Sequence, residues 1–479
     1  MNQAHRTHGS HLLRRIRILT LIGALLSWVP GGYSQGPVGN DKNIEAVGVP
    51  PIPASLAKEV EPYKGLYGLP LAGWNPTRRE IWLKGLSSVT WVSRIITPGF
   101  MPIPSMYIRQ GGIYDVYFQP QGKYLADTRD AAGNEMFHLY LYDMGSGNTT
   151  LLSDGKSRST EPVWSNAGNK IVYSSTPASG TGVNLRILDR LDPKADRPLV
   201  QSSGTYLKAY DWSPDDKQIV FCDFSSNTTA TVWLADATSG NKTLLSPKGD
   251  QAEFYDSPQF SKDGKGVYVV TDHDSDMRRI AYIELANRKM SYVPSDPKWD
   301  VDEFQLSPDG KTLAYITNED GISRLHLLDL VAGKERSTPQ LPIGIISDLK
   351  WNKDSTEVAF NFKSPQTPND VYSVNSQTGK AELWAKSITK GVDTSQFAQA
   401  ELIHWPTFDS RTVSGFLVSS ANQVYRQASR DHRHSRWPRR AIPSNVQLRG
   451  ELFPKCVGRR KALSERPGVN RLWQDVRTP

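Results

Sequence analysis

A motif that recurs every 44 to 48 residues is the feature that most constrains the fold of this 479-residue chain. Each copy joins an aromatic or apolar residue, a short polar turn of the type Ser-Pro-Asp-Gly-Lys, and a strand of alternating apolar residues. The copies begin at Trp74, Phe118, Trp164, Trp212, Phe260, Leu306 and Trp351. Repeats of this length are typical of β-propeller blades. The sequence therefore predicts an all-β fold, with a seven-bladed propeller over residues 66–400.

The physical chemistry of the motif supports that prediction. Asp-Gly pairs tolerate positive φ, so two strands can reverse tightly around them. The alternation that follows places Ile219 and Phe221, like Leu313 and Tyr315, on faces that pack against neighbouring blades. Segments such as 139–152 (LYLYDMGSGNTTLL) fit the third strand, outer turn and fourth strand of a blade. One four-stranded blade cannot bury both faces alone, so we expect a ring that closes by pairing of its two ends.

Polar motifs inside the repeats have ordinary structural explanations. Residues 272–276 (DHDSD) look like a metal cluster, but they follow a strand end, and neighbouring side chains there alternate in direction. Asn148, Asn227 and Asn241 begin glycosylation sequons, yet each lies in a predicted hairpin turn where Asn and Thr are common. The repeat tryptophans share one motif position, which favours core packing over a ligand cage. We therefore expect no metal site and no cofactor.

The start of the chain has the pattern of a signal peptide. A basic n-region containing four arginines precedes an apolar stretch at 18–29, which is too short to span a bilayer. A cut before Gln35 fits, which makes 1–34 the signal peptide; an uncleaved N-terminal anchor is the alternative. Residues 35–65 are interpreted as a linker and lead-in. The rest of the chain is expected to be exported, to the periplasm or outside the cell.

The net charge of +8 is unevenly distributed. Residues 1–40 carry +4 and residues 419–479 carry +10, which leaves −6 for residues 41–418. The basic total therefore does not describe the folded body, and we expect no nucleic-acid partner and no membrane contact beyond the signal segment. The two cysteines, Cys222 and Cys456, do not form a disulfide framework.

The repeat alone does not indicate a function, because a propeller by itself is a binding scaffold. Four specific segments are more informative. The segments are 271–285 (TDHDSDMRRIAYIEL), 299–330 (WDVDEFQLSPDGKTLAYITNEDGISRLHLLDL), 364–380 (SPQTPNDVYSVNSQTGK) and 401–417 (ELIHWPTFDSRTVSGFL). They resemble the propeller of exported bacterial serine peptidases of the prolyl oligopeptidase family, including acylaminoacyl-peptidase-like and dipeptidyl-peptidase-like members. The segment 401–417 resembles the connection into an α/β-hydrolase domain. A TolB-like periplasmic propeller shares the WD40-like blades but not this connection.

The resemblance implies a catalytic domain that this sequence does not continue into. In the family, a Ser nucleophile in a G-x-S-x-G elbow is followed by Asp and His. No such elbow follows Leu417, and the Gly-x-Gly pairs at 145–147 and 180–182 lie in predicted propeller turns. His432 and His434 lie in Arg-rich sequence without a nearby elbow. No catalytic, cofactor-binding or metal-binding residue is assigned, and the chain is expected to be inactive.

Residues 418–479 have no apolar period and predict a disordered basic tail. Back-translation with a shift of one base gives a second interpretation. Residues 435–442 can then be read as HGGPEGQ and residues 465–476 as PNVRGSTGYGKTF, which resemble segments of the missing hydrolase domain. The same one-base shift applies without interruption along the whole tail. We therefore interpret the tail as an out-of-frame translation that starts near codon 418.

These observations predict a truncated, non-catalytic propeller from a prolyl-oligopeptidase-like serine peptidase whose intact relatives carry out proteolysis. The alternative is a free-standing TolB-like periplasmic propeller that binds a peptide or protein partner. Without a hydrolase domain one propeller face would be uncovered, so poor solubility is expected. The oligomeric state is left open.

Overall fold

The structure is a computed structural model and describes residues 52–85, 91–107, 112–130, 133–178, 180–189, 191–247, 253–293 and 298–418. The predicted signal peptide at 1–34, the tail beyond residue 418, and with it His432, His434 and Cys456, lie outside the described residues. The chain divides into two compact units, Met1–Gly65 and Leu66–Pro479.

The described part of the first unit is a short helical segment. Helix α2 spans Ala54–Val60 and continues into the 3₁₀ helix η1, Glu61–Gly65. The helix begins directly after Pro53 and consists mostly of good helix formers, Ala, Leu, Lys and Glu. The lead-in that the sequence analysis interpreted as a linker therefore contains one short helix. Within the described ranges, no helix is long and apolar enough to cross a membrane.

The second unit contains seven four-stranded antiparallel sheets, the blades. Blades 1 to 3 comprise β1 (Leu71–Trp74), β2 (Ile81–Leu83), β3 (Trp91–Ile95), β4 (Ile103–Tyr107); β5 (Gly112–Phe118), β6 (Tyr124–Asp130), β7 (His138–Asp143), β8 (Thr149–Leu151); β9 (Arg158–Trp164), β10 (Lys170–Thr176), β11 (Asn184–Asp189) and β12 (Arg197–Val200). Blades 4 and 5 comprise β13 (Tyr206–Trp212), β14 (Gln218–Ser226), β15 (Thr229–Asp236), β16 (Lys242–Leu244); β17 (Tyr255–Phe260), β18 (Gly266–Thr271), β19 (Arg279–Glu284) and β20 (Met290–Tyr292). Blades 6 and 7 comprise β21 (Asp300–Leu306), β22 (Thr312–Glu319), β23 (Ile322–Asp329), β24 (Lys334–Arg336); β25 (Ile345–Trp351), β26 (Glu357–Ser364), β27 (Thr367–Asn375) and β28 (Ala381–Ala385). A 3₁₀ turn, η2 (Pro193–Ala195), precedes β12.

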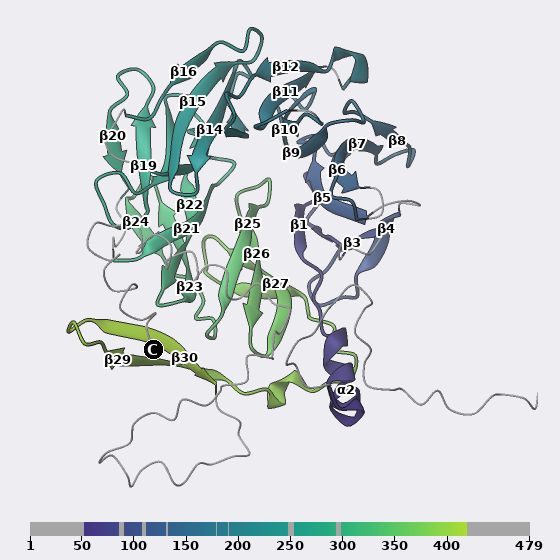
Figure 1. Ribbon diagram of the computed structural model, residues 1–479, viewed down its shortest axis with the longest axis vertical. Helices are drawn as coiled ribbons and strands as arrows, with labels where there is room; N and C mark the ends of the chain where they lie inside the picture. The colour runs from purple at the N-terminus through teal and green to yellow at the C-terminus, as the bar shows by residue number, and fades with distance from the viewer. Residues whose placement is uncertain are drawn as a thin grey trace, which may run out of the picture. The chain divides into compact units, whose positions relative to one another are not determined.

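The blades form a closed ring, which confirms the predicted seven-bladed propeller. Each blade is a meander of four consecutive strands. The first strand of every blade contacts the first strand of the next, and β25 of blade 7 contacts β1 of blade 1. In Figure 1 the colour runs from β1 through β5 and β14 to β25, which lies beside β1 again. The first strands are therefore the inner strands of the ring.

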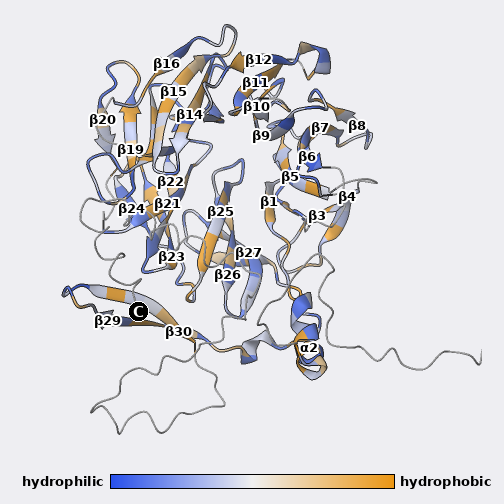
Figure 2. Cartoon of the chain, in the orientation of Figure 1, coloured by the Kyte–Doolittle hydropathy of each residue, from blue (hydrophilic) through white to orange (hydrophobic). Residues whose placement is uncertain are grey.

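The core is divided into seven apolar clusters, one between each pair of neighbouring blades. Ile219 and Phe221 pack in the cluster between blades 3 and 4, and Leu313 and Tyr315 pack between blades 5 and 6. These contacts confirm the faces assigned from the alternation. Figure 2 shows the same pattern as apolar bands along the blade strands, with polar residues at many of the turns.

The turn between the first and second strands has a left-handed residue at one position in six blades. That position is Gly122, Gly168, Asp216, Gly264, Gly310 or Ser355, each with φ between 56° and 73°. Glycine occupies four of the six because it alone adopts this φ without steric cost. The Asp-Gly element of the motif is therefore explained by the turn.

The two ends of the ring pair, as the sequence predicted, but only over a short stretch. The two ends meet in a single bridge, in which Tyr67 and Ile388 exchange hydrogen bonds of 3.1 and 2.7 Å. Blades 1 and 7 each contain four strands of their own, so no blade is shared between the ends of the ring. Closure depends chiefly on packing between blades 7 and 1, where β1 and β2 contact β26, β27 and β28 through one apolar cluster.

A separate hairpin follows blade 7. It is preceded by the 3₁₀ turn η3 (Thr394–Gln396) and pairs β29 (Ala400–Pro406) with β30 (Thr412–Val418). This is the segment that the sequence analysis interpreted as the start of a connection to a hydrolase domain.

Candidate functional site: the inner strands and the connection face

The repeat tryptophans join each blade to the one before it. Their indole Nε1 atoms donate to inner-strand carbonyl oxygens of the preceding blade at 2.9 to 3.1 Å. The pairs are Trp74 with Lys350, Trp164 with Tyr117, Trp212 with Val163, and Trp351 with Gln305. The predicted core role of these residues is therefore confirmed, and each indole also satisfies a polar group at a blade interface.

At two of the three copies that begin with Phe or Leu, another side chain makes the connection. Asp211 accepts a hydrogen bond from the backbone N–H of Phe260 at 2.9 Å. Gln259 donates to the carbonyl of Phe304 at 3.1 Å and accepts from the N–H of Leu306 at 3.0 Å. The interfaces between blades 4 and 5 and between blades 5 and 6 are thus joined without an indole.

A set of polar residues on or beside the inner strands, here called the inner polar ring, was not predicted from the sequence. Its members are Lys84, Asp115, Glu161, Lys208, Tyr210, Asp256, Glu303 and Asp348. Every inner strand has an irregularity in its pairing with the second strand near these positions. Glu161 and Asp348 have left-handed backbones, with φ of 55° and 59°. Such bulges re-aim side chains.

Contacts within the ring cross four of the seven blade interfaces. Lys84 Nζ lies 3.2 Å from Asp115 Oδ1, and Lys208 Nζ lies 3.1 Å from Glu161 Oε1. Tyr210 donates its hydroxyl to Asp256. Glu303 accepts hydrogen bonds from the backbone N–H groups of Asp348 and Leu349 at 2.9 and 2.8 Å. Burial acts to raise the pKa of Asp348, but the charges of Lys84 and Lys350 outweigh it and the pKa is lowered.

The ring side chains differ in how readily they ionise. Burial, followed by the neighbouring charge of Asp348, raises the pKa of Glu303. Burial and the charge of Asp256 raise the pKa of Tyr210 far above its ordinary value, so its hydroxyl stays protonated and donates. The inner polar ring therefore combines fixed donors with carboxylates, and it can hold polar groups but has no arrangement for nucleophilic catalysis.

A detectable sequence signal marks part of this ring. Asp115, Glu161, Glu303 and Asp348 each lie three positions before the first residue of their motif copy. An acid at this fixed offset in four of seven blades could have been found by aligning the copies. Its inward direction could not, because the bulge that produces it is a property of strand pairing.

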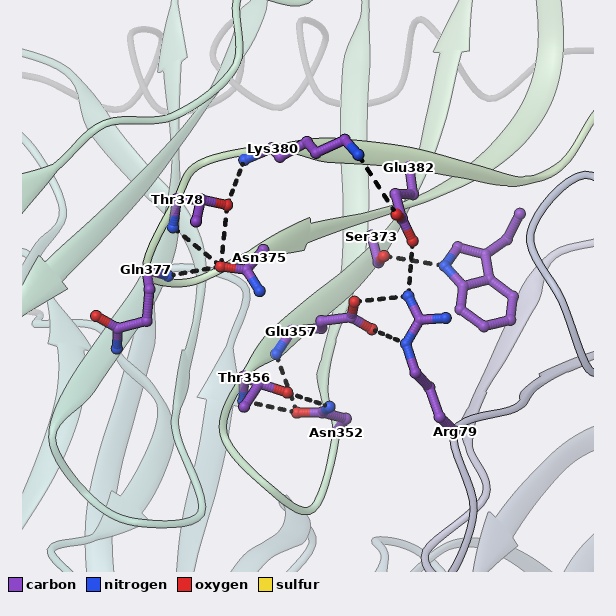
Figure 3. Close-up of polar contacts among 11 residues, drawn as sticks. Arg79, Asn352, Thr356, Glu357, Ser373, Asn375, Gln377, Thr378, Lys380 and Glu382 are labelled. Carbon is purple, nitrogen blue, oxygen red and sulfur yellow. Dashed lines mark hydrogen bonds and ion pairs between the residues drawn. The ribbon is translucent and has the colours of Figure 1, made fainter.

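The interface between blades 7 and 1 contains an ionic contact that we call the latch (Figure 3). Arg79, in the turn after β1, lies with Nη2 2.7 Å from Glu357 Oε1 and 2.6 Å from Glu382 Oε2. Its guanidinium carbon is 4.8 Å from the ring centre of Trp384. Hydrogen bonding with Glu357 raises the pKa of Arg79. The latch therefore joins the first and last blades through a permanent cation.

One fully buried ion pair lies within blade 2. Asp127 is 0% exposed and accepts two hydrogen bonds from Arg129, at 2.6 and 3.0 Å. The guanidinium also lies 4.0 Å from the ring centre of Tyr140. Burial raises the pKa of Asp127 from 3.8 to about 6, although Arg129 acts in the opposite direction.

This raised pKa predicts a pH dependence of stability. Between pH 3.8 and about 6 the native Asp127 holds a proton that the unfolded chain has released, so its contribution to the free energy of unfolding falls as pH rises. We expect the wild type to lose up to about 3 kcal/mol relative to Asp127→Asn across this window. Urea unfolding of both proteins at pH 3.5, 5 and 7 measures the difference. If the free energies of unfolding of the two proteins changed in parallel with pH, the raised pKa of Asp127 would be contradicted.

The polar motifs weighed from the sequence lie where they were expected. His273 contacts Glu253 at 2.8 Å and Asp274 at 3.1 Å, and among the described residues no three acidic, His or Cys side chains are placed to hold a metal ion. Asn148, Asn227 and Asn241 are exposed in hairpin turns. The Gly-x-Gly pairs at 145–147 and 180–182 also lie in turns between propeller strands.

The chain enters and leaves the propeller at one face. In a four-stranded meander, the connections between blades and the turns between second and third strands lie at the same end of every blade. We call this end the connection face. Tyr67 before β1 and Ile388 after β28 lie there, since each adjoins a blade connection.

The hairpin β29–β30 contacts this same face. Asp320, in the turn between β22 and β23, accepts from Ser414 at 2.9 Å and lies 3.1 Å from Nε2 of His404. The Gln366 amide, in the β26–β27 turn, donates to the carbonyls of Ser395 and Phe397 at 3.1 Å. Both ends of the propeller and the outgoing hairpin thus lie on the connection face.

Aromatic and cationic side chains gather at the same ends of the inner strands. Tyr114 is 58% exposed, and its ring centre lies 4.5 Å from that of Phe137. The guanidinium of Arg158 lies 5.2 Å from the Phe137 ring. In blade 5 the guanidinium of Arg278 lies 4.3 Å from the ring of Phe254. Aromatic faces with adjacent cations are groups that recognise peptides.

Comparison with known proteins places these features in a family. Residues 112–387 match the family described as prolyl oligopeptidase, N-terminal β-propeller domain. Dipeptidyl-peptidase 5 from Porphyromonas gingivalis is 22% identical over 284 residues, which cover 57% of this chain and 40% of that protein. The family match begins with blade 2 and ends just after blade 7.

Solved structures show the same fold. A prolyl endopeptidase matches with a TM-score of 0.62 at 19% identity, covering 76% of this chain and 57% of that one. Prolyl oligopeptidase B from Galerina marginata matches with a TM-score of 0.63 at 14% identity, covering 77% and 57%. The chain spans less than two thirds of the length of these relatives. Because the family match covers more than half of its residues, the chain belongs to the prolyl oligopeptidase family through its N-terminal β-propeller domain.

Proposed function

We propose that this chain is the exported, non-catalytic propeller part of a prolyl-oligopeptidase-like serine peptidase, whose intact form acts on short peptides. In the intact form the propeller would cover the active site and restrict access to short chains. The observation that carries the proposal is the position of both propeller ends and of the β29–β30 hairpin on the connection face. A hydrolase domain continuing from the hairpin would face the inner strands and their polar and aromatic side chains.

The chemistry of the described residues agrees with a role in binding rather than bond cleavage. The connection face offers Tyr114, Arg158 and Arg278, which suit peptide carbonyls and carboxylates. The inner polar ring adds the ion pairs of Asp115 with Lys84 and of Glu161 with Lys208, whose charged groups suit the polar groups of a peptide.

A serine-directed fluorophosphonate probe tests the absence of catalysis in this chain. We expect no labelling of the purified protein and no release of chromogenic product from dipeptide substrates. The matched control is the same gene with one base removed near codon 418, which should encode the hydrolase domain in frame. Labelling of the control but not of this chain supports the proposal, and stoichiometric labelling of this chain contradicts it.

The nucleotide sequence around codons 416–419 tests the interpretation of the tail independently. Removal of one base there should open a reading frame through a G-x-S-x-G elbow. A reading frame without that elbow would instead favour the alternative, a free-standing periplasmic propeller. A pull-down that finds one saturable peptide or protein partner, retained after deletion of residues 418–479, would favour this alternative.

A further inference from the structure

The hairpin β29–β30 has an uncovered apolar strand with an open edge. It forms a two-stranded sheet of its own, and within the described residues no third strand pairs with it. Side chains of Val413, Phe416, Leu417 and Val418 are 39–58% exposed. Figure 2 shows apolar segments on this hairpin. A two-stranded sheet is marginally stable in water unless further strands or a covering surface are added.

The open edge of β30 carries hydrogen-bonding groups that point away from β29. Thr407 donates its N–H to Arg411 across the turn at 2.8 Å, which makes this pair a hydrogen-bonded one. Since hydrogen-bonded and non-hydrogen-bonded pairs alternate along the ladder, the pairs of Ser414 with His404 and Phe416 with Leu402 are non-hydrogen-bonded. The backbone N–H and C=O groups of Ser414 and Phe416 therefore face the outer edge.

The composition of β30 favours pairing with an identical strand. The strand Thr412–Val418 (TVSGFLV) contains no charged residue and no proline, so two copies meet antiparallel without like charges opposite one another. Strand β29 carries Glu401 and has His404 beside Asp320, so its edge is less suited to self-pairing. Short neutral segments of high β-propensity are the ones that pair edge to edge.

The chain's own tail differs from β30 in composition. Residues 419–479 carry a net charge of +10 and have no run of alternating apolar residues. A second copy of β30 offers the same neutral, apolar edge that the first copy leaves open. Four strands would then replace two. The exposed Val413 and Leu417 lie on one face of the strand, and Phe416 and Val418 lie on the other, so pairing would extend both apolar faces.

We propose that two copies of this chain associate through antiparallel pairing of their β30 strands, forming one four-stranded sheet across a two-fold axis. The inference is independent of whether an intact relative hydrolyses peptides. It requires only the hairpin as the structure describes it.

Sedimentation velocity of the full exported chain from 1 to 100 µM tests this pairing. We expect a reversible monomer–dimer equilibrium whose dissociation constant rises at least about tenfold in Phe416→Lys, because the substitution places a positive charge in the pairing strand of each copy. Val331→Lys is the matched control, since Val331 is a 79% exposed apolar residue in the β23–β24 turn. It should leave the dissociation constant unchanged.

Hydrogen exchange of the wild type keeps the test independent of how the variant folds. The amides of Ser414 and Phe416 should become more protected as concentration rises. A monomer at 100 µM, or a dimer unaffected by a folded Phe416→Lys variant, would overturn the proposal. Protection of these amides that is independent of protein concentration would also overturn the proposal. It would show that another segment of the same chain covers the edge of β30.

Discussion

Replacement of Trp384 by alanine should lower the free energy of unfolding by about 3–5 kcal/mol, the range for a large aromatic residue removed from a packed core. Trp384 is 0% exposed and lies between blades 7 and 1. Its ring meets that of Trp74 edge to face, with centres 5.3 Å apart, and its indole N–H donates to Ser373 at 2.9 Å. The substitution leaves a cavity at the interface where the ring closes.

Guanidinium unfolding followed by circular dichroism measures this effect. Trp405→Ala is the matched control, because Trp405 is 45% exposed on the β29–β30 hairpin, outside the seven blades. Its substitution should cost less than about 1 kcal/mol. Equal losses in the two variants would show that the closing interface does not carry the stability assigned to it.

The second large effect is expected at Asn361, which is 1% exposed. Its side-chain oxygen accepts from the backbone N–H of Leu71 in blade 1 at 2.9 Å and from the amide of Asn369 at 3.1 Å. Its own amide donates to Asp348 at 2.7 Å. Asn361→Leu preserves the size of the side chain but leaves buried donors unsatisfied. Each such donor costs about 1–3 kcal/mol, so the total loss should exceed 2 kcal/mol.

Asn241→Leu provides the control for Asn361. Asn241 is exposed in the β15–β16 turn, so its replacement should change the free energy of unfolding by less than about 0.5 kcal/mol. Both proteins would be compared by equilibrium unfolding in urea at neutral pH. A stability of Asn361→Leu within 0.5 kcal/mol of the wild type would mean that water satisfies these donors.

The strand plan of each blade was predictable because its signals are local. The Ser-Pro-Asp-Gly-Lys turn around Asp309 sets a tight reversal, and the alternation through Leu313 and Tyr315 sets the buried faces. Both signals act within a few residues, so they recur in each copy. The core role of Trp74 and Trp212 followed from their shared position in the repeat.

The inner polar ring and the hydrogen bonds between blades were not predicted. Glu161 and Asp348 face their neighbours because bulges interrupt the regular side-chain period of the inner strands. A bulge depends on the pairing partner, which the linear order of residues does not specify. At the interface of blades 5 and 6, Gln259 makes the hydrogen bond that a tryptophan makes elsewhere. This bond could not be predicted for the same reason.

The sequence by itself determined the number of blades, their strand order and their buried faces, because each blade is specified by contacts between residues close in the chain. Only the tertiary structure decided how the ring closes. The hydrogen bond from Leu71 to Asn361 and the ion pair from Arg79 to Glu357 join residues almost three hundred positions apart. They meet because the rotations between seven successive blades add up to a full turn, and no single copy of the motif contains that sum.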